Sequence, residues 1–261
     1  MNNFTKITDI ALGPFTVQAW GTMVALGMLI GLWLTLKEAK RKKVDKETVL
    51  DTFFWMMLAA ILGSRVLYVI LFWRDFVDSP LDAFKIWEGG LVLLGGVLSA
   101  IGVLWFMCRK KGIPMLKMTD TMAPGLAAGI CCGRIGCYLI GDHIGSPMEG
   151  DFFWGSIYSG TPDVLRHEPS LYLAINGFAL FLFLWFMRKR VKKQGNLTML
   201  FFVWYGAARF LLDVFRNTDL PNGLADPRFA SFTISQYVSL LLFLLGAYSL
   251  IRSRWSSPKK S

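Results

Sequence analysis

The sequence predicts an all-α, polytopic membrane protein, and its composition, charge pattern and long apolar segments each point to this class. Of the 261 residues, 54% are apolar and only 18% are charged, with a mean hydropathy of +0.46, whereas soluble domains are about one-quarter charged. Charged side chains are absent from Gly89 to Met107 and crowded between Lys37 and Glu47. Windows of roughly 20 apolar residues are long enough to cross a bilayer. A soluble globular enzyme is therefore excluded.

Seven apolar segments are expected to be membrane-spanning helices, because each is long enough to span and is separated from the next by polar or charged residues. They are residues 15–36, 51–73, 89–108, 119–140, 171–187, 198–216 and 234–251. No cleavable signal peptide is expected, since residues 1–14 are polar and mixed and the first apolar segment is long enough to span. We expect one transmembrane domain over residues 1–261.

The basic residues predict how the chain is oriented. They gather after spans one, three, five and seven, in the segments 37–46, 109–117, 188–193 and 252–260. The positive-inside rule places these segments in the cytoplasm, so the N-terminus is expected outside and the C-terminus inside. The outer segment 141–170 carries both histidines of the chain. It is expected to form a small extracytoplasmic cap, because a loop this long is more often functional than a simple connection.

The net charge of +10 resides largely in these short basic blocks. This distribution is typical of loops at an anionic leaflet and not of nucleic-acid binding, so no nucleic acid is expected as a partner. The cysteines have no C-x-x-C spacing and no histidine inside their spans, which favours helix packing over metal ligation. They are Cys108, Cys131, Cys132 and Cys137. No metal or cofactor is predicted.

Three arginines, Arg65, Arg134 and Arg209, fall inside predicted spans, where each charge costs roughly 2.5–3.5 kcal/mol on insertion scales. Glu88, at the entry to span three, is the expected partner of Arg65. Asp213 follows Arg209 by one helical turn and can pair with it on the same face.

Arg134 differs because no acidic residue precedes it at helical spacing. It lies between Gly133 and Gly136, which allow another group to approach closely. A guanidinium without a carboxylate suits phosphate, which it binds through two parallel hydrogen bonds. In a membrane the abundant phosphate is a phospholipid headgroup. The residues therefore indicate an anionic lipid, and they leave open whether it is transported, modified or only bound.

Several blocks of the chain, in order, resemble the prolipoprotein diacylglyceryl transferase family. The signature-like block is Gly133–Gly145, which reads Gly-Arg-Ile-Gly-Cys-Tyr-Leu-Ile-Gly-Asp-His-Ile-Gly. The other similar blocks are Gly63–Tyr68, Trp87–Gly96, His167–Tyr172, Tyr205–Arg216 and Ser235–Gln236. The likeness covers nearly the whole chain and agrees with seven spans.

The resemblance implies a transferase of lipoprotein biosynthesis in the bacterial inner membrane. Such enzymes move the diacylglyceryl group of phosphatidylglycerol onto the lipobox cysteine of a prolipoprotein signal peptide, forming a thioether and releasing glycerol 1-phosphate. By position, Arg134 and Arg209 would hold the lipid phosphate and stabilise its charge. The other phosphatidylglycerol-binding positions implied are Gly95, Gly96, Gly136, Asp142 and Gly145, and the supporting positions are Arg65, Glu88, Asp213 and Arg216.

Two of the positions that depart from the family pattern bear directly on the chemistry. Leu94 stands where members commonly have a histidine that is a favoured candidate base, and Cys137 replaces an asparagine of the signature. His143 could serve as the catalytic base. Alternatively, the positive potential of Arg134 and Arg209 could lower the pKa of the substrate thiol. The rival functions are a catalytically altered member that binds anionic phospholipid and a transferase that uses a different acceptor.

Overall fold

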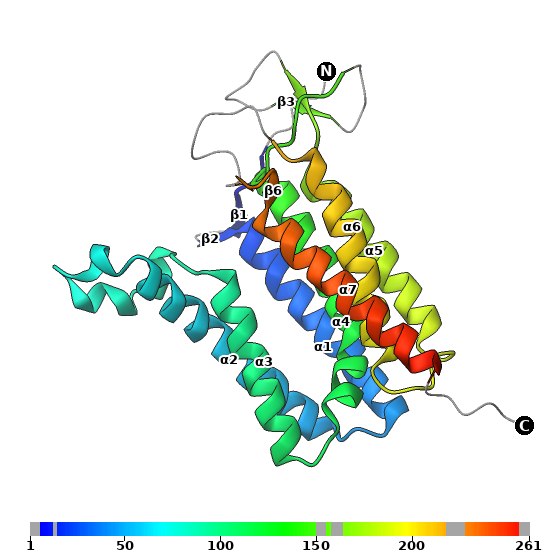
Figure 1. Ribbon diagram of the computed structural model, residues 1–261. Coiled ribbons are helices and arrows are strands. Elements are labelled where there is room, and N and C mark those ends of the chain that lie inside the picture. Colours follow the sequence, from blue (N-terminus) through cyan, green and yellow to red (C-terminus); the bar gives the residue numbers. More distant parts are fainter. Residues whose placement is uncertain (1–5, 13–14, 150–154, 158–163, 218–227, 256–261) are drawn as a thin grey trace, which may run out of the picture. The chain divides into compact units, whose positions relative to one another are not determined.

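The computed structural model describes residues 6–12, 15–149, 155–157, 164–217 and 228–255 (Figure 1). Within them are seven helices long and apolar enough to cross a membrane, which confirms the predicted fold class. These are α1 (Ala19–Lys42), α2 (Lys46–Leu71), α3 (Leu93–Lys110), α4 (Met115–Ile140), α5 (Pro169–Met187), α6 (Asn196–Leu212) and α7 (Ile234–Trp255). Each predicted span overlaps one helix. The largest difference is in α1, which continues through the basic residues to Lys42, because lysine and arginine are good helix formers.

Short elements connect the helices. Three antiparallel pairs of strands are formed by β1 (Asp9–Leu12) with β2 (Phe15–Gln18), β3 (Ser156–Ile157) with β4 (Leu165–Arg166), and β5 (Arg228–Phe229) with β6 (Phe232–Thr233). The 3₁₀ turns η1 (Trp73–Phe76), η2 (Pro80–Phe84) and η3 (Ile86–Glu88) join α2 to α3, and η4 (Asp213–Phe215) follows α6. None of these was predicted, since such short pairings leave no periodic pattern in a sequence.

The chain divides into two compact units. The first unit lies within residues 1–35 and 122–261, and the second within 36–121. The expectation of one transmembrane domain over residues 1–261 stays a prediction.

Small residues let the helices of the first unit approach closely. A Cβ added to Gly27 of α1 would lie 2.9 Å from the Cβ of Cys132 in α4, and one added to Gly177 of α5 would lie 3.1 Å from the Cα of Cys131. Both cysteines are thus helix-packing residues, and all four cysteines are free thiols. The buried core between α4, α5 and α6 consists of Ala123, Ala127, Leu180, Leu184, Leu197 and Phe201.

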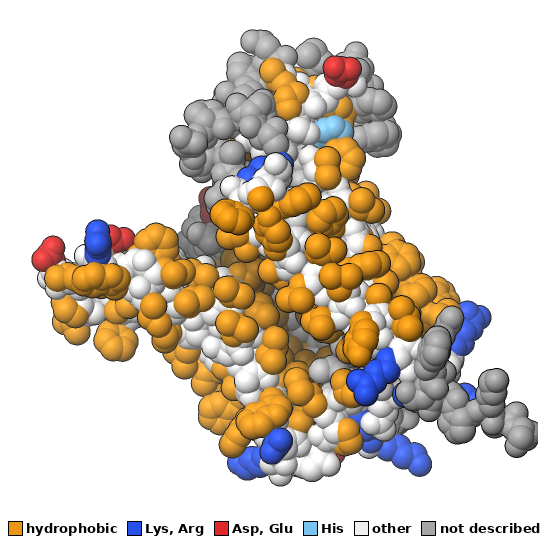
Figure 2. Space-filling view, viewed as in Figure 1, with side chains coloured by type: hydrophobic (Ala, Val, Ile, Leu, Met, Phe, Trp, Pro, Cys, Tyr) orange, Lys and Arg blue, Asp and Glu red, His pale blue; other side chains and the backbone are white. Residues whose placement is uncertain are grey.

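The two ends of the first unit differ in character. At one end α4 and α6 finish, α5 and α7 begin, and the strand pairs lie close by (Figure 1); we call it the site end. At the other end the α5–α6 connection meets the end of α7, where the Lys193 Nζ donates to the Ser253 carbonyl over 3.1 Å. Figure 2 shows hydrophobic side chains along the helices and Lys and Arg side chains at this second, basic end.

In the second unit α2 and α3 pack through glycines. A Cβ on Gly95 would clash with the carbonyl oxygen of Gly63, and one on Gly96 would lie 2.9 Å from the carbonyl oxygen of Ala60. Gly95 and Gly96 therefore bring α3 against α2. Their expected contact with phosphatidylglycerol stays a prediction.

Arg65 in α2 is buried and is satisfied by the backbone. Its guanidinium and Nε donate to the carbonyls of Asp82 (2.6 Å), Ala83 (2.8 Å), Gly89 (2.7 Å) and Gly90 (3.2 Å). The Glu88 side chain, its expected partner, lies outside the described residues. Because these bonds fasten the α2–α3 connection to α2, Arg65 has a structural role in the second unit.

Candidate active site

The site end of the first unit brings three arginines together. Arg134 lies in the last two turns of α4, Arg209 in the last turn of α6, and Arg216 directly after η4. The charges of Arg134 and Arg216 both act on Arg209, and all three act on His143. Residues far apart in the sequence thus create one region of strong positive potential.

Arg134 is the member to which the described part of the chain offers no partner. Among the residues that the structure describes, its half-buried guanidinium makes no hydrogen bond and no ion pair. A Cβ on the neighbouring Gly133 would meet nothing within 4 Å, so there is open space beside that glycine. A Cβ on Gly136, in contrast, would lie 2.9 Å from the Cβ of Met23 in α1. Gly136 is therefore a packing position in the structure, and its contact with lipid stays a prediction. Arg134 has its donors available for a ligand.

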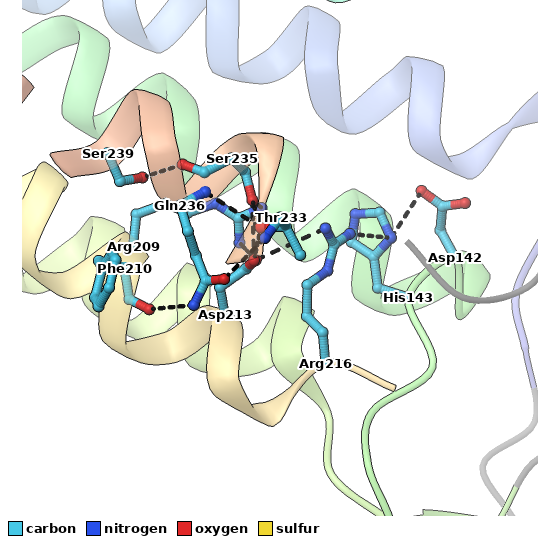
Figure 3. A network of polar contacts seen from close by, with 10 residues as sticks. All are labelled: Asp142, His143, Arg209, Phe210, Asp213, Arg216, Thr233, Ser235, Gln236 and Ser239. Carbon is cyan, nitrogen blue, oxygen red and sulfur yellow. Dashed lines mark hydrogen bonds and ion pairs between the residues drawn. The ribbon is translucent and has the colours of Figure 1, made fainter. Parts of the chain in front are cut away.

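Arg209 and Arg216 share one carboxylate, that of the fully buried Asp213. Its Oδ1 lies 3.1 Å from Arg209 Nη1 and 3.7 Å from Arg216 Nη1 (Figure 3). The predicted pairing of Arg209 with Asp213 is present. One negative charge faces two positive ones, so with Arg134 the cluster keeps an excess of positive charge.

The other oxygen of Asp213 is held by the start of α7. Its Oδ2 accepts hydrogen bonds from the hydroxyls of Thr233 and Ser235, the latter over 3.0 Å, and Arg209 Nη2 donates to Ser235 over 3.3 Å. Sequence analysis missed Thr233. The signal that could have found it is the Thr-x-x-Gln pattern over residues 233–236, which typically caps a helix.

His143 lies directly beside the arginine cluster. Its Nδ1 is 3.4 Å from Arg216 Nη2 and 3.7 Å from Asp142 Oδ2. Since a guanidinium can only donate, Nδ1 is the acceptor and the ring proton resides on Nε2. Burial, followed by the positive charge of Arg216, lowers the pKa of His143 to about 4. The imidazole is therefore neutral at physiological pH.

An extended segment holds His143 and Arg216 in this arrangement. Gly145 forms an antiparallel bridge with Arg216, and the Ser146 N–H donates to the Phe215 carbonyl over 2.9 Å. On its other side, the His167 N–H donates to the Ser146 carbonyl over 3.0 Å. The segment after α4 thus pairs with the segments before α5 and after α6.

Gly145 and Arg166 explain why this segment packs so tightly. A Cβ on Gly145 would clash with the carbonyl oxygen of His167, so only glycine fits. Arg166 is buried and its Nη1 donates to the Gly145 carbonyl over 3.1 Å. Sequence analysis did not single out Arg166, because nothing in its local sequence marks it as buried.

Cys137, Asp142 and His143 place one potential metal ligand each within 4.8 Å of one another. Arg216 already donates to the His143 Nδ1, and three guanidinium groups repel a divalent cation across short distances. We therefore assign no metal to this group. Cys137 is buried, in keeping with the expected packing role.

The structure gathers Arg134, His143, Asp142, Gly145, Arg209, Asp213 and Arg216 at the site end of the first unit. Arg65, Gly95 and Gly96 belong to the second unit. The fold and the site define a polytopic membrane protein with a half-buried, arginine-rich centre suited to an anionic headgroup.

Comparison with known proteins identifies the family. A sequence profile of the family described as prolipoprotein diacylglyceryl transferase matches residues 8–252. The phosphatidylglycerol–prolipoprotein diacylglyceryl transferase of Pseudoalteromonas atlantica is 35% identical over 237 residues, which cover 89% of this chain and 84% of that protein. The enzyme of that name from Legionella pneumophila (strain Philadelphia 1) is 32% identical over 95% of this chain and 98% of its own length. The one from Marinomonas sp. is 33% identical over 95% of this chain and 93% of its own length. The chain belongs to the prolipoprotein diacylglyceryl transferase family.

Proposed function

We propose that this protein transfers the diacylglyceryl group of phosphatidylglycerol to the lipobox cysteine of prolipoproteins. The observation that carries the proposal is the arginine cluster, in which Arg134 has no protein partner among the described residues while Arg209 and Arg216 share the one carboxylate of Asp213. Family membership supplies the reaction class.

The reaction needs what this cluster offers. The thiolate sulfur attacks the glyceryl carbon next to the phosphate, a C–S bond forms, and the C–O bond breaks with its electron pair moving to the phosphate oxygen. The leaving glycerol 1-phosphate gains negative charge relative to the diester. Fixed guanidinium groups stabilise that developing charge more than they stabilise the substrate, which lowers the barrier.

His143 is the proposed base that takes the thiol proton. In the free protein its low pKa, about 4, makes it a weak base. A phosphate bound to Arg134 and Arg209 offsets the positive charges that act on the imidazole, so the pKa of His143 rises when the lipid is present. The base therefore gains strength when the donor is bound, which compensates for Leu94 at the usual histidine position.

We further propose that the chain is a multi-pass protein of the bacterial inner membrane with its N-terminus outside and its C-terminus in the cytoplasm. The basic connections support this orientation. The site end then faces outward, on the side where a signal peptide presents its lipobox cysteine after translocation. The predicted cap of residues 141–170 stays a prediction, since 150–154 and 158–163 lie outside the described residues.

A second candidate is a family member that binds phosphatidylglycerol without transferring it. Two observations favour this second function: Leu94 cannot accept a proton, and the pKa of His143 is low in the lipid-free protein. The second observation counts only if bound lipid leaves the pKa of His143 low. The two candidates differ in product formation and not in lipid binding.

Transfer is tested with the purified full chain in nanodiscs containing phosphatidylglycerol and a lipobox peptide. We expect the peptide to gain the mass of one diacylglyceryl group, and to gain none in nanodiscs of phosphatidylcholine alone. The same chain should restore growth of a bacterium depleted of its own transferase. Lipid binding by the chain without any peptide modification would select the second candidate.

A further inference from the structure

The start of α7 is fixed by a reciprocal cap. The Thr233 N–H donates to Gln236 Oε1 over 3.0 Å, and the Gln236 N–H donates to the Thr233 hydroxyl oxygen over 3.2 Å. This is the capping box of a Thr-x-x-Gln sequence, which satisfies two backbone donors at a helix start. Both side chains are buried.

The same hydroxyl has a second bond that capping does not require. It donates its one proton to Asp213 Oδ2, while its oxygen accepts from Gln236 (Figure 3). With Ser235 as the second donor, Oδ2 is occupied by hydroxyls and Oδ1 is turned toward the arginines. The rotamer of Asp213, and through it the places of Arg209 and Arg216, thus depends on the first turn of α7.

We propose that Thr233 is a positioning residue for diacylglyceryl transfer, which holds the Asp213 carboxylate so that Arg209 and Arg216 converge on the lipid phosphate. This inference rests on the proposed function. It assigns the start of α7 a part in the site, although Arg134, Arg209 and Arg216 all lie outside that helix.

Variants that remove different sets of these bonds separate positioning from capping. Thr233→Val keeps the shape and the backbone N–H that donates to Gln236. It removes the hydroxyl, and with it the bonds to the Gln236 N–H, to Asp213 and to the Ser235 hydroxyl. Gln236→Leu removes the side-chain acceptor of the cap and a 3.4 Å contact to the Phe210 carbonyl, and leaves Thr233 free to donate to Asp213. Thr233→Ser retains the hydroxyl and is the conservative rescue.

The measurements are kcat and KM for phosphatidylglycerol in nanodiscs, with the melting temperature of each variant. We expect Thr233→Val to lower kcat/KM on the order of 10- to 100-fold, the effect of slightly misplacing catalytic groups. Gln236→Leu should lower the melting temperature and change kcat/KM far less, and Thr233→Ser should restore most of the activity. Equal losses of kcat/KM in Thr233→Val and Gln236→Leu would mean that Thr233 only caps the helix, which would overturn the proposal. Full activity of Thr233→Val would overturn it as well.

Phosphatidylglycerol binding distinguishes this proposal from the proposed function. If the wild-type chain transfers nothing, the proposed function fails, and the affinity for phosphatidylglycerol in nanodiscs is compared instead. Weaker binding by Thr233→Val than by Gln236→Leu would still support positioning of the arginines. Equal binding by the two variants would reject it.

Discussion

Gly145 and Arg216 face each other across an antiparallel backbone bridge, and this bridge brings the Arg216 guanidinium to 3.4 Å from the Nδ1 of His143. Residues from the end of α4 and the end of α6 are thereby fixed to one another by main-chain contacts. The position of the proposed base relative to the arginines is a property of the backbone and not of side-chain rotamers alone.

Gly145→Ala is expected to disturb that bridge, because the added Cβ would clash with the His167 carbonyl oxygen. The backbone must shift, at an expected cost of about 1–3 kcal/mol in the free energy of unfolding, and transfer should fall with it. Thermal unfolding and the peptide mass assay measure the two effects. The control is Gly102→Ala in α3, where a Cβ meets nothing within 4 Å; an equal loss in both variants would contradict the steric explanation.

Arg134→Ala is expected to reduce transfer by about 10²–10³-fold, the usual effect of removing a donor that stabilises charge in the transition state. Since Arg134 has no protein partner among the described residues, folding and membrane insertion should be unaffected. Arg74→Ala, which removes an equal charge from the α2–α3 connection, serves as the control. Retention of most activity in Arg134→Ala would remove the phosphate role from this residue.

The pKa of His143 can be followed in a chain with only two histidines. NMR of isotope-labelled histidine, assigned with a His167→Asn variant, should show His143 neutral down to about pH 5, since its pKa is about 4. Phosphatidylglycerol should raise that pKa. An ordinary pKa near 6.5 in the lipid-free protein would contradict the burial and charge described here.

The same shift makes the stability of the protein depend on pH. The folded pKa of His143 lies below the value of about 6.5 for an unfolded chain, so the unfolded state binds more protons as the pH falls. Stability should therefore decline between about pH 6.5 and pH 4. The His143→Asn variant, whose side chain does not titrate, should lose less stability than the wild-type chain over this pH range, as measured by thermal unfolding. If the variant and the wild-type chain declined equally, groups other than His143 would cause the effect.

Arg65→Lys is expected to loosen the α2–α3 connection, because a lysine cannot reach the four carbonyls that Arg65 binds. Hydrogen bonds from a charged donor contribute about 1.5–3 kcal/mol each, so the variant should be markedly less stable. Hydrogen exchange should rise across residues 80–91. Arg74→Lys, at an exposed position, should leave exchange there unchanged.

Much of the fold follows from local sequence. Long apolar segments specify the seven helices, because length and hydropathy suffice for a helix in a bilayer. The Arg209–Asp213 pair could be predicted because both residues lie on one helix, and Arg134 stood out because its charge had no sequence neighbour to balance it. Family resemblance, by contrast, was needed to place Arg216 and Asp142 near the site.

The missed features all depend on contacts between distant segments. Thr233 meets Asp213, and Gly145 meets Arg216, only after the chain has folded. Arg65 donates to backbone carbonyls of the connection that follows its own helix, and its expected pairing with Glu88 stays a prediction. A sequence shows which charges need partners, and it does not show when the main chain supplies them.

The guanidinium of Arg134, which has no partner among the residues that the structure describes, should also affect how the protein behaves during purification. A cation left unmatched in a low-dielectric setting attracts any anionic amphiphile present, so purification in mild detergent should carry native phospholipid along with the polypeptide. Washing that lipid away leaves mutually repelling cations at the helix ends, and the delipidated preparation should be the fragile one. Reconstitution buffers for this enzyme are therefore best supplied with an acidic phospholipid from the first extraction step.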